Sequence, residues 1–277
     1  MSNVIVIGGG AAGMMAAYAA ALCGHQVKLI EQNEKLGKKI FITGKGRCNI
    51  TNAGDMDNLF ANVMSNPKFL YSAFYTFNNE QMMSFLEEYG LKMKVERGNR
   101  VFPVSDHSSD VIATLRKALA NKNVEVFLHT KVNHLLVTKE QIKGVGLSDG
   151  REVPADAVIV ATGGFSYQTT GATGDGYRFA EKTGHKLVQR TPALVPFEIK
   201  EAWVKELQGL SLRNVSVSVY NEKKKLYEDF GEMLFTHFGV SGPLILSASG
   251  MIKAKQFENE LKLYIDLKPA LTAEQLD

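Results

Sequence analysis

The segment that decides the fold is VIVIGGGAAG, residues 4–13. Its first four residues are apolar and β-branched, which is typical of a strand buried on both faces of a parallel sheet. A glycine-rich turn follows, and an alanine-rich helix extends to about Cys23, with Gly24 placed where a glycine commonly ends a helix. Residues 27–30 form a second apolar run with Glu31 directly after it. Together these features predict a βαβ unit of about thirty residues.

Each glycine of the G-x-G-x-x-G pattern has its own physical task. Gly8 permits a tight turn, Gly10 lets a pyrophosphate approach the backbone, and Gly13 lets the helix pack close to the strand. The helix N-terminus offers free N–H groups and the positive end of a dipole. Glu31 stands 21 residues after Gly10 and can accept hydrogen bonds from a ribose. We therefore predict a dinucleotide site; the alternative is a glycine turn without a ligand.

The chain after Glu31 favours a long ligand. Residues 34–39, EKLGKK, lead into residues 44–52, GKGRCNITN, which form a glycine-rich and basic loop. Such a loop can surround a ligand with backbone N–H groups and present cations to its phosphates. This loop argues against a dehydrogenase that uses NAD alone, and a surface loop without a ligand is the alternative.

The following elements are expected to alternate between helix and strand. We predict helices within residues 66–90 and over 108–120, and strands over 124–128, 131–137, 142–147, 152–153 and 157–161. Asp106 and Ser108 are candidate caps of the second helix. The last strand ends in a second glycine turn, residues 162–164, and an open α/β sheet places ligand-contacting loops at such strand ends.

The composition changes near residue 190. Pro192 and Pro196 mark a crossing into strand-rich sequence, notably residues 212–220. We therefore expect a nucleotide-binding domain over residues 1–190 and a β-rich domain over 191–277. The basic triplet of residues 223–225 is expected at a hairpin tip.

Composition limits the partners. The net charge is +3 over 277 residues, without the concentrated basic face that nucleic acid requires. The apolar stretch of 13 residues over 11–23 is shorter than the roughly 20 residues of a membrane span. Cys23 and Cys48 form no C-x-x-C pair, which argues against a disulfide framework or a zinc site. We expect a cytoplasmic protein that acts on a small molecule, with no metal, no nucleic acid and no membrane partner; the oligomeric state stays open.

Four further strings complete a family resemblance. They are residues 44–52, GKGRCNITN, residues 161–164, ATGG, residues 173–177, TGDGY, and residues 235–243, FTHFGVSGP. With the N-terminal turn, they resemble the HI0933-like (YhiN-type) flavoprotein family of NAD(P)/FAD-dependent oxidoreductases, whose members include aminoacetone oxidases and bile-acid reductases. The resemblance implies an α/β fold, with a glutathione-reductase-like FAD-binding Rossmann domain and an inserted β-rich domain. It also implies that a final segment that returns to the FAD domain is missing, since the sequence ends as a helix begins over residues 272–274.

The resemblance also implies which residues contact FAD. The candidate cofactor-binding residues are Gly8, Gly10, Ala11, Ala12, Gly13, Glu31, Gln32, Lys38, Lys39, Arg47, Cys48, Asn49, Val132, Ala161, Thr162 and Gly163. The N-terminal turn and Glu31 hold the ADP half. Lys38, Lys39 and Arg47 lie near the phosphates or the flavin. Val132 contacts adenine through its backbone.

No catalytic residue follows from the sequence. Cys48 stands beside Arg47, and nearby cations lower the pKa of a thiol, but a small buried apolar cysteine is favoured. His237 is a candidate proton donor, with a structural histidine favoured over it. No second dinucleotide motif is present, so NAD(P)H would bind transiently as an electron donor, or oxygen would be the oxidant. The expected function is an FAD-dependent oxidoreductase that acts on a small organic substrate; the alternative is a non-catalytic FAD-binding module or an incomplete fragment of the enzyme.

Overall fold

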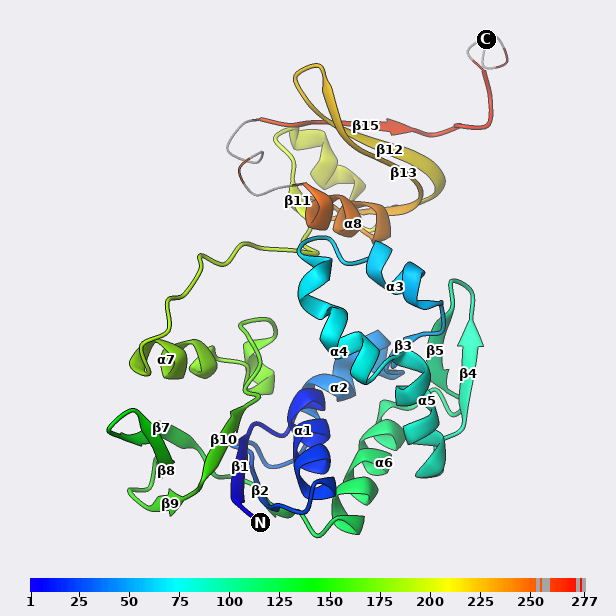
Figure 1. Ribbon diagram of the computed structural model, residues 1–277. Helices are drawn as coiled ribbons and strands as arrows, with labels where there is room; N and C mark the ends of the chain where they lie inside the picture. Colours follow the sequence, from blue (N-terminus) through cyan, green and yellow to red (C-terminus); the bar gives the residue numbers. More distant parts are fainter. Residues whose placement is uncertain (253–254, 256–259, 273–274, 276–277) are drawn as a thin grey trace. The chain divides into compact units, whose positions relative to one another are not determined.

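The computed structural model describes residues 1–277 except 253–254, 256–259, 273–274 and 276–277 (Figure 1). Ala273 and Glu274, where the sequence predicts part of a final helix, therefore lie outside the described residues. The chain divides into two compact units, residues 1–187 and 188–277. Each unit has its own sheet and core.

The first unit is built on a parallel sheet. Its strand order is β10 (Ala157–Val160), β1 (Asn3–Ile7), β2 (Gln26–Ile30) and β6 (Glu125–Phe127). In the register of this sheet, Val6 of β1 pairs with Ile159 on one side and with Leu29 on the other. The predicted βαβ unit is confirmed, because α1 (Ala11–Leu22) connects β1 to the parallel strand β2.

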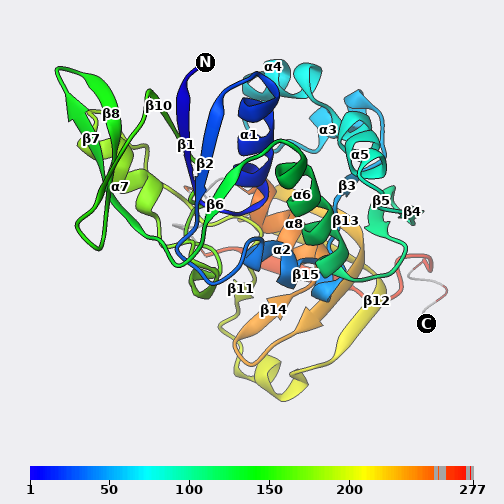
Figure 2. The ribbon, with the colours of Figure 1, turned by 90° about the horizontal axis from the view of Figure 1, so that it is seen from below.

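Alternating side chains of β1 bury both faces of this sheet. Val4 and Val6 pack into a core with Met14 and Ala17 of α1, together with residues of α5 (Asn79–Glu88) and α6 (Ser108–Asn121). Ile5 and Ile7 pack on the opposite face. That face is covered by the predicted β-excursion and a helix (Figure 2), which are β7 (Val132–Thr138), β8 (Gln141–Leu147), β9 (Glu152–Pro154) and α7 (Asp175–Lys182). The result is a three-layered unit.

A long excursion lies between β2 and α6. Its elements are α2 (Lys38–Ile42), a 3₁₀ turn over Thr43–Gly46, β3 (Thr51–Asn52), α3 (Met56–Ala61), a 3₁₀ turn over Pro67–Leu70, α4 (Tyr71–Thr76), α5, β4 (Met93–Glu96) and β5 (Arg100–Pro103). Strands β3, β5 and β4 form a small antiparallel sheet. The two helices predicted within residues 66–90 are α4 and α5. Asn78 caps α5 through a capping box with Gln81.

The predicted caps of α6 are wrong. The residue at the cap position is His107, and no side chain caps the helix. Asp106 instead directs its carboxylate to Arg47 and Lys94. Ser108 donates its hydroxyl to the carbonyl oxygen of Phe41 at 2.8 Å, so it serves packing against α2.

The second unit is built on an antiparallel sheet. Its strand order is β11 (Phe197–Glu198), β14 (Gly239–Ser241), β13 (Lys224–Phe235), β12 (Ser211–Asn221) and β15 (Lys262–Asp266). A 3₁₀ turn over Ala202–Leu207 and α8 (Pro243–Met251) complete its core, where Val217, Met233 and Ile245 are buried. The basic triplet lies at the tip of the hairpin between β12 and β13, as predicted, since Asn221 pairs with Lys224.

Candidate functional site

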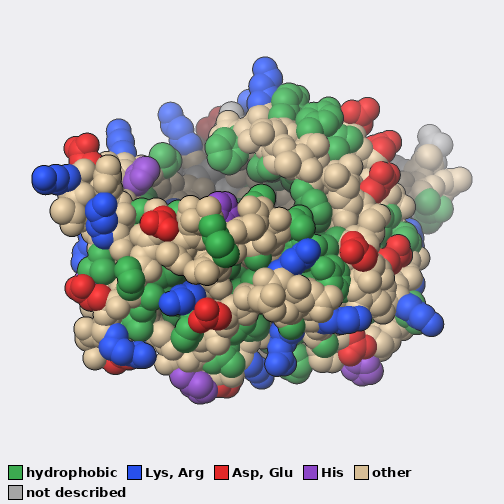
Figure 3. Space-filling model, turned by 60° about the horizontal axis from the view of Figure 1, so that its bottom comes forward, with side chains coloured by type: hydrophobic (Ala, Val, Ile, Leu, Met, Phe, Trp, Pro, Cys, Tyr) green, Lys and Arg blue, Asp and Glu red, His purple; other side chains and the backbone are tan. Residues whose placement is uncertain are grey.

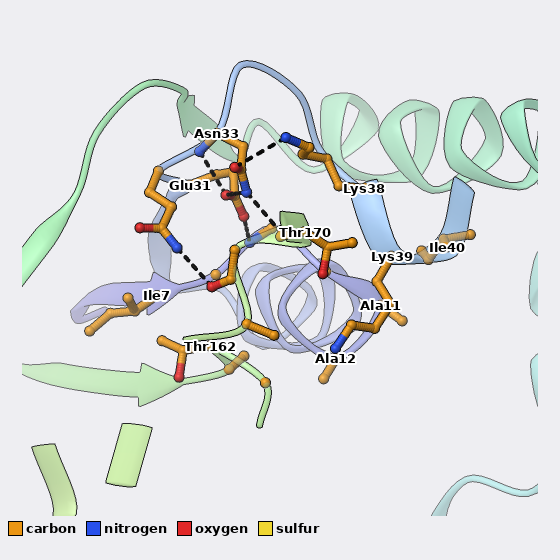
Figure 4. A pocket seen from close by; sticks show the side chains of 18 of the residues that line it. Ile7, Ala11, Ala12, Glu31, Asn33, Lys38, Lys39, Ile40, Thr162 and Thr170 are labelled. Atoms are coloured by element: carbon orange, nitrogen blue, oxygen red, sulfur yellow. Dashed lines mark hydrogen bonds between the residues drawn. The ribbon is translucent and has the colours of Figure 1, made fainter. Parts of the chain in front are cut away.

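A cavity of about 440 Å³ lies at the carboxyl ends of the parallel strands, beside the N-terminus of α1 (Figure 4). The predicted cofactor residues in its wall are Gly8, Gly10, Ala11, Ala12, Glu31, Gln32, Lys38, Lys39, Cys48, Asn49, Val132, Ala161, Thr162 and Gly163. Gly13 and Arg47 belong to the predicted set but are not in the wall. The structure thus gathers residues that are far apart in the sequence at the edge of the sheet where α/β folds bind ligands.

Two of the three motif glycines are required by the protein chain itself. Gly8 has a φ of +106°, and a Cβ there would lie 2.5 Å from the carbonyl oxygen of Ala161. A Cβ on Gly13 would lie 1.7 Å from the carbonyl oxygen of Gly8. Gly8 and Gly13 therefore allow the turn, the neighbouring strand end and the helix to pack closely.

Gly10 differs from both. Its φ of −81° and ψ of −171° are open to any residue, and a Cβ at this position would meet nothing within 4 Å. Nothing in the protein chain therefore requires glycine here, whereas a ligand close to the backbone would. This is the arrangement expected of a pyrophosphate cradle.

The start of α1 is suited to an anion. Gly10 is the N-cap, no side chain caps the helix, and no acidic residue lies in its first turn. Ala11 and Ala12, the first helical residues, are exposed and line the cavity. The positive end of the helix dipole and its N–H groups are therefore available to phosphate oxygens.

Glu31 is held firmly at the end of β2. It is 8% exposed. Its Oε2 accepts the backbone N–H of Gly9 at 2.6 Å. Its Oε1 accepts the backbone N–H and the side-chain amide of Asn33 at 2.8 and 2.6 Å. The carboxylate therefore has a fixed orientation in the cavity wall, as a ribose acceptor requires.

The two lysines at the start of α2 have different surroundings. Lys38 Nζ lies 3.3 Å from Glu34 Oε2 and 3.4 Å from Asn33 Oδ1. It is therefore held near the end of the cavity that contains Glu31 and Asn33, the acidic end. Within the described residues, Lys39 has no carboxylate partner, and Figure 4 shows its side chain running toward Ala11 and Ala12. Lys39 is thus the lysine better placed for phosphate.

The loop that carries the G-R-C-N string forms another part of the wall. Several of its residues have left-handed backbone conformations, among them Gly44 at φ +56° and Cys48 at φ +61°. Cys48 is 6% exposed and lines the cavity together with Asn49. Burial raises the pKa of the Cys48 thiol. This direction favours the buried apolar cysteine over the activated thiolate.

Arg47 points to carboxylates of the protein and not into the cavity. Its Nε donates to Asp106 Oδ1 at 2.8 Å, its Nη2 forms an ion pair with Glu96, and its guanidinium lies 4.1 Å from the centre of the Phe102 ring. These partners raise the pKa of Arg47, with Glu96 as the largest cause. Lys94 joins the same network at 2.6 Å from Asp106. Arg47 thus attaches the loop to β4, β5 and the start of α6.

The cavity wall also contains residues that were not among the predicted cofactor contacts. They are Asn33, Thr43, Thr130, Lys131, Thr170, Gly171, Ala172 and Asp175, among others. Gln32 donates to the carbonyl oxygen of Gly171 at 2.8 Å, which brings the chain after the second glycine turn to the end of β2. The T-G-D-G string that contains Asp175 was visible in the sequence. No local signal marks Asn33, because its role depends on residues distant in the chain.

The FTHFGVSGP string has a structural explanation in the second unit. A Cβ on Gly239 would lie 2.1 Å from the carbonyl oxygen of Phe197, and Gly242 has a φ of +94° at the start of α8. His237 is exposed, and its ring contacts that of Phe238. The glycines of this string therefore serve close strand packing and a turn.

None of the described helices combines the length and the apolar character that crossing a membrane requires. In the same part of the chain, no three His, Cys, Asp or Glu side chains come together in a way that could hold a metal ion.

Several curated proteins are similar to this chain. It is 34% identical to a 3-dehydro-bile acid delta(4,6)-reductase of Clostridium scindens over 100% of this chain and 67% of the relative. It is 30% identical to a ribosomal RNA dihydrouridine synthase of Escherichia coli over 92% of this chain and 62% of the relative. The chain thus spans about two thirds of the length of these relatives.

Solved structures show the same fold at low sequence identity. A 3-ketosteroid-delta4-(5alpha)-dehydrogenase from Rhodococcus jostii matches with a TM-score of 0.55 at 15% identity, over 76% of this chain and 59% of that one. A 3-ketosteroid delta1-dehydrogenase from Sterolibacterium denitrificans matches with a TM-score of 0.55 at 16% identity, over 77% of this chain and 62% of that one.

The model of the HI0933-like protein Rossmann domain matches residues 2–259. This match spans nearly all of the first unit and extends to residue 259 of the second. The protein therefore belongs to the HI0933-like family and has its Rossmann-type FAD-binding fold.

Proposed function

We propose that the protein is an FAD-dependent oxidoreductase that acts on a small organic substrate. The observation that carries this proposal is the contrast among the motif glycines. Cβ atoms on Gly8 and Gly13 would collide with the chain, whereas one on Gly10 would enter open space in the cavity. A glycine that the protein itself does not need is explained by a ligand against its backbone.

The surrounding groups suit the ADP half of the cofactor. The N-terminus of α1 and Lys39 would balance the charge of the pyrophosphate. Glu31 would accept a ribose hydroxyl, and Val132 would lie against the adenine. When bound, FAD supplies the hydride chemistry, and the protein binds and orients it.

Cys48, the cysteine in the cavity wall, is not suited to nucleophilic catalysis. Burial raises the pKa of Cys48, so its thiol is neutral at neutral pH and is not a nucleophile. We assign no catalytic residue. The protein's contribution would be to bind and orient FAD, with Thr43, Cys48 and Asn49 in the cavity wall.

The direction of the reaction is proposed from the relatives. The names of two relatives, a delta(4,6)-reductase and a dihydrouridine synthase, both denote the reduction of a carbon–carbon double bond. We infer that this protein also reduces its substrate, with NAD(P)H as a transient electron donor.

We propose a small molecule as substrate, in a cytoplasmic setting. The face drawn in Figure 3 has lysines and arginines interspersed with acidic residues, without a broad basic area. Nucleic acid would favour a basic stripe. Cys23 and Cys48 are both free thiols, as expected in a reducing compartment.

Two domains follow from this proposal. We infer that residues 1–190 form the FAD-binding domain and that residues 191–277 belong to a β-rich domain. The cavity lies wholly within the first unit, and the second unit has a separate antiparallel sheet.

The test begins with the colour and absorbance of the purified protein. We expect bound flavin, or uptake of added FAD by a stripped sample. Stopped-flow mixing with NADH, NADPH and oxygen in separate runs then follows the flavin absorbance. Bleaching by a nicotinamide supports a reductase. Flavin that binds but is reduced by no nicotinamide or substrate would support a non-catalytic FAD-binding module, and a protein that takes up no FAD would overturn the proposal.

A further inference from the structure

The side chain of Asn33 joins three segments at the acidic end of the cavity (Figure 4). Its Nδ2 donates to Glu31 Oε1 at 2.6 Å and to the carbonyl oxygen of Thr170 at 3.1 Å. Its Oδ1 accepts from Lys38 Nζ at 3.4 Å. The amide thus uses its two donors and its acceptor toward the end of β2, the chain before α7, and α2.

Asn33 also determines how many acceptor positions of the Glu31 carboxylate remain for a ligand. A carboxylate has about four acceptor positions. Asn33 fills two of them on Oε1, with its backbone N–H and its side-chain amide, and Gly9 fills one on Oε2. One position is left, on Oε2. The carboxylate therefore presents a single acceptor in a fixed direction.

Residues 170–172 pack closely against the side-chain amide of Asn33. Gly171 has a φ of +95°, and a Cβ there would lie 2.6 Å from Asn33 Nδ2. The same Cβ would lie 3.0 Å from Gln32 Nε2, which donates to the carbonyl oxygen of Gly171. A side chain at this position would push the segment away from Asn33.

We propose that Asn33 is a positioning residue for the ribose end of the cofactor. It fixes the carboxylate of Glu31 so that one oxygen receives a ribose hydroxyl, and it holds residues 170–172 as the facing wall. This inference rests on the proposed function, because it needs an adenine nucleotide in the cavity. An amide is required, since Asp would place a second carboxylate 2.6 Å from Glu31 Oε1.

The first test uses Asn33→Asp and the pH dependence of FAD affinity. Two carboxylates this close cannot both ionise without repulsion, so the pKa of one of them rises. At low pH the protonated Asp donates as the amide does, and as the pH rises that donor is lost. We expect the FAD affinity of the variant to fall roughly tenfold between about pH 5.5 and 8, while wild type changes little over the same range.

The double variant Glu31→Gln with Asn33→Asp is the matched control. In this variant the side-chain amide stands at position 31 and the carboxylate at position 33, so the two side chains are no longer both acidic. We expect its FAD affinity to be independent of pH over this range. A flat profile for Asn33→Asp alone would overturn the proposal.

The second test compares ADP with 2′-deoxy-ADP by calorimetry. If Glu31 receives the 2′-hydroxyl, wild type should bind ADP roughly ten to one hundred times more tightly. Asn33→Ala removes the side-chain bond to Glu31 Oε1 and opens a second acceptor position there, while the two backbone bonds stay, so we expect the ratio to shrink by roughly threefold to tenfold. Glu34→Ala is the control, because Glu34 is half exposed and is not in the cavity wall, and it should keep the wild-type ratio.

The outcomes separate the two proposals. If Asn33→Ala lowers the melting temperature of the apoprotein but keeps the full ratio, Asn33 is merely structural and the inference fails. If wild type binds ADP but not FAD, the proposed function fails while the ADP series still tests Asn33. If wild type binds neither nucleotide, both proposals are wrong.

Discussion

The carbonyl oxygen of Gly8 lies 1.7 Å from where a Cβ on Gly13 would stand. The turn and the first helical turn of α1 are thus in direct backbone contact. We expect Gly13→Ala to force them apart and to destabilise the apoprotein by about 1–3 kcal/mol or more, as overpacking does. Urea unfolding of flavin-free protein measures this. Unchanged apo stability would show that α1 can shift at little cost.

Gly10→Val should leave the stability of the apoprotein nearly unchanged and abolish FAD uptake. The backbone at Gly10 is extended, and a Cβ there meets no described atom within 4 Å, so the apoprotein should melt at nearly the wild-type temperature. The new side chain would occupy the space of the pyrophosphate, and FAD uptake should be lost. The measurement is thermal unfolding of stripped samples beside an FAD titration. A large loss of apo stability with retained uptake would contradict the phosphate cradle.

The parts of the fold that depend on neighbouring residues could be predicted from the sequence. Turn, helix and Glu31 follow one another within a short stretch, so local spacing determines their geometry. The same is true of β7 to β9, whose strand periods and turns are local.

Arg47 shows where sequence reasoning stops. A basic residue in a glycine-rich loop suits a phosphate, but its partners Glu96 and Asp106 are 49 and 59 residues away. Asn33 is similar, since its contact with Thr170 spans 137 residues. Long-range hydrogen bonds of single polar residues leave no periodic signal in one sequence.

Arg47→Met tests whether this arginine stabilises the loop. Lys94 and then Arg47 lower the pKa of Asp106 below its ordinary value. A folded-state pKa below the unfolded one adds stability that is present at neutral pH and lost as the pH falls through the folded pKa. We expect a lower melting temperature for the variant at pH 7, with the difference from wild type shrinking below about pH 4.

Asp106→Asn is the companion variant. If Arg47 acts through this ion pair, the loss of stability in the double variant should be smaller than the sum of the two single losses, because both single variants remove the Arg47–Asp106 interaction. Fully additive losses would contradict the network. If Arg47→Met loses FAD affinity while the melting temperature of the apoprotein is unchanged, the result would support the prediction that Arg47 contacts the cofactor.

The two cysteines should differ in reactivity. Cys23 is exposed at the end of α1, whereas Cys48 is buried and burial raises its pKa. We expect iodoacetamide at pH 8 to modify Cys23 much faster, and bound FAD to slow Cys48 further because it lines the cavity. Mass spectrometry of peptides over time measures both rates. Faster labelling of Cys48 would show an activated thiol and reopen a catalytic role for it.

Glu31→Ala should weaken FAD binding and also lower apo stability. The variant leaves the amide donors of Gly9 and Asn33 without their acceptor, and each buried unsatisfied donor costs about 1–3 kcal/mol before water enters the cavity. The ribose loses a charged acceptor, so affinity should fall by roughly one to two decades. Glu34→Ala is the control, because Glu34 is half exposed and its ion pair in the described part of the chain is with Lys38. FAD titration and urea unfolding of both variants give the two quantities separately. Unchanged affinity in Glu31→Ala, with the expected loss of apo stability, would mean that this carboxylate only braces the turn and that the ribose is bound elsewhere.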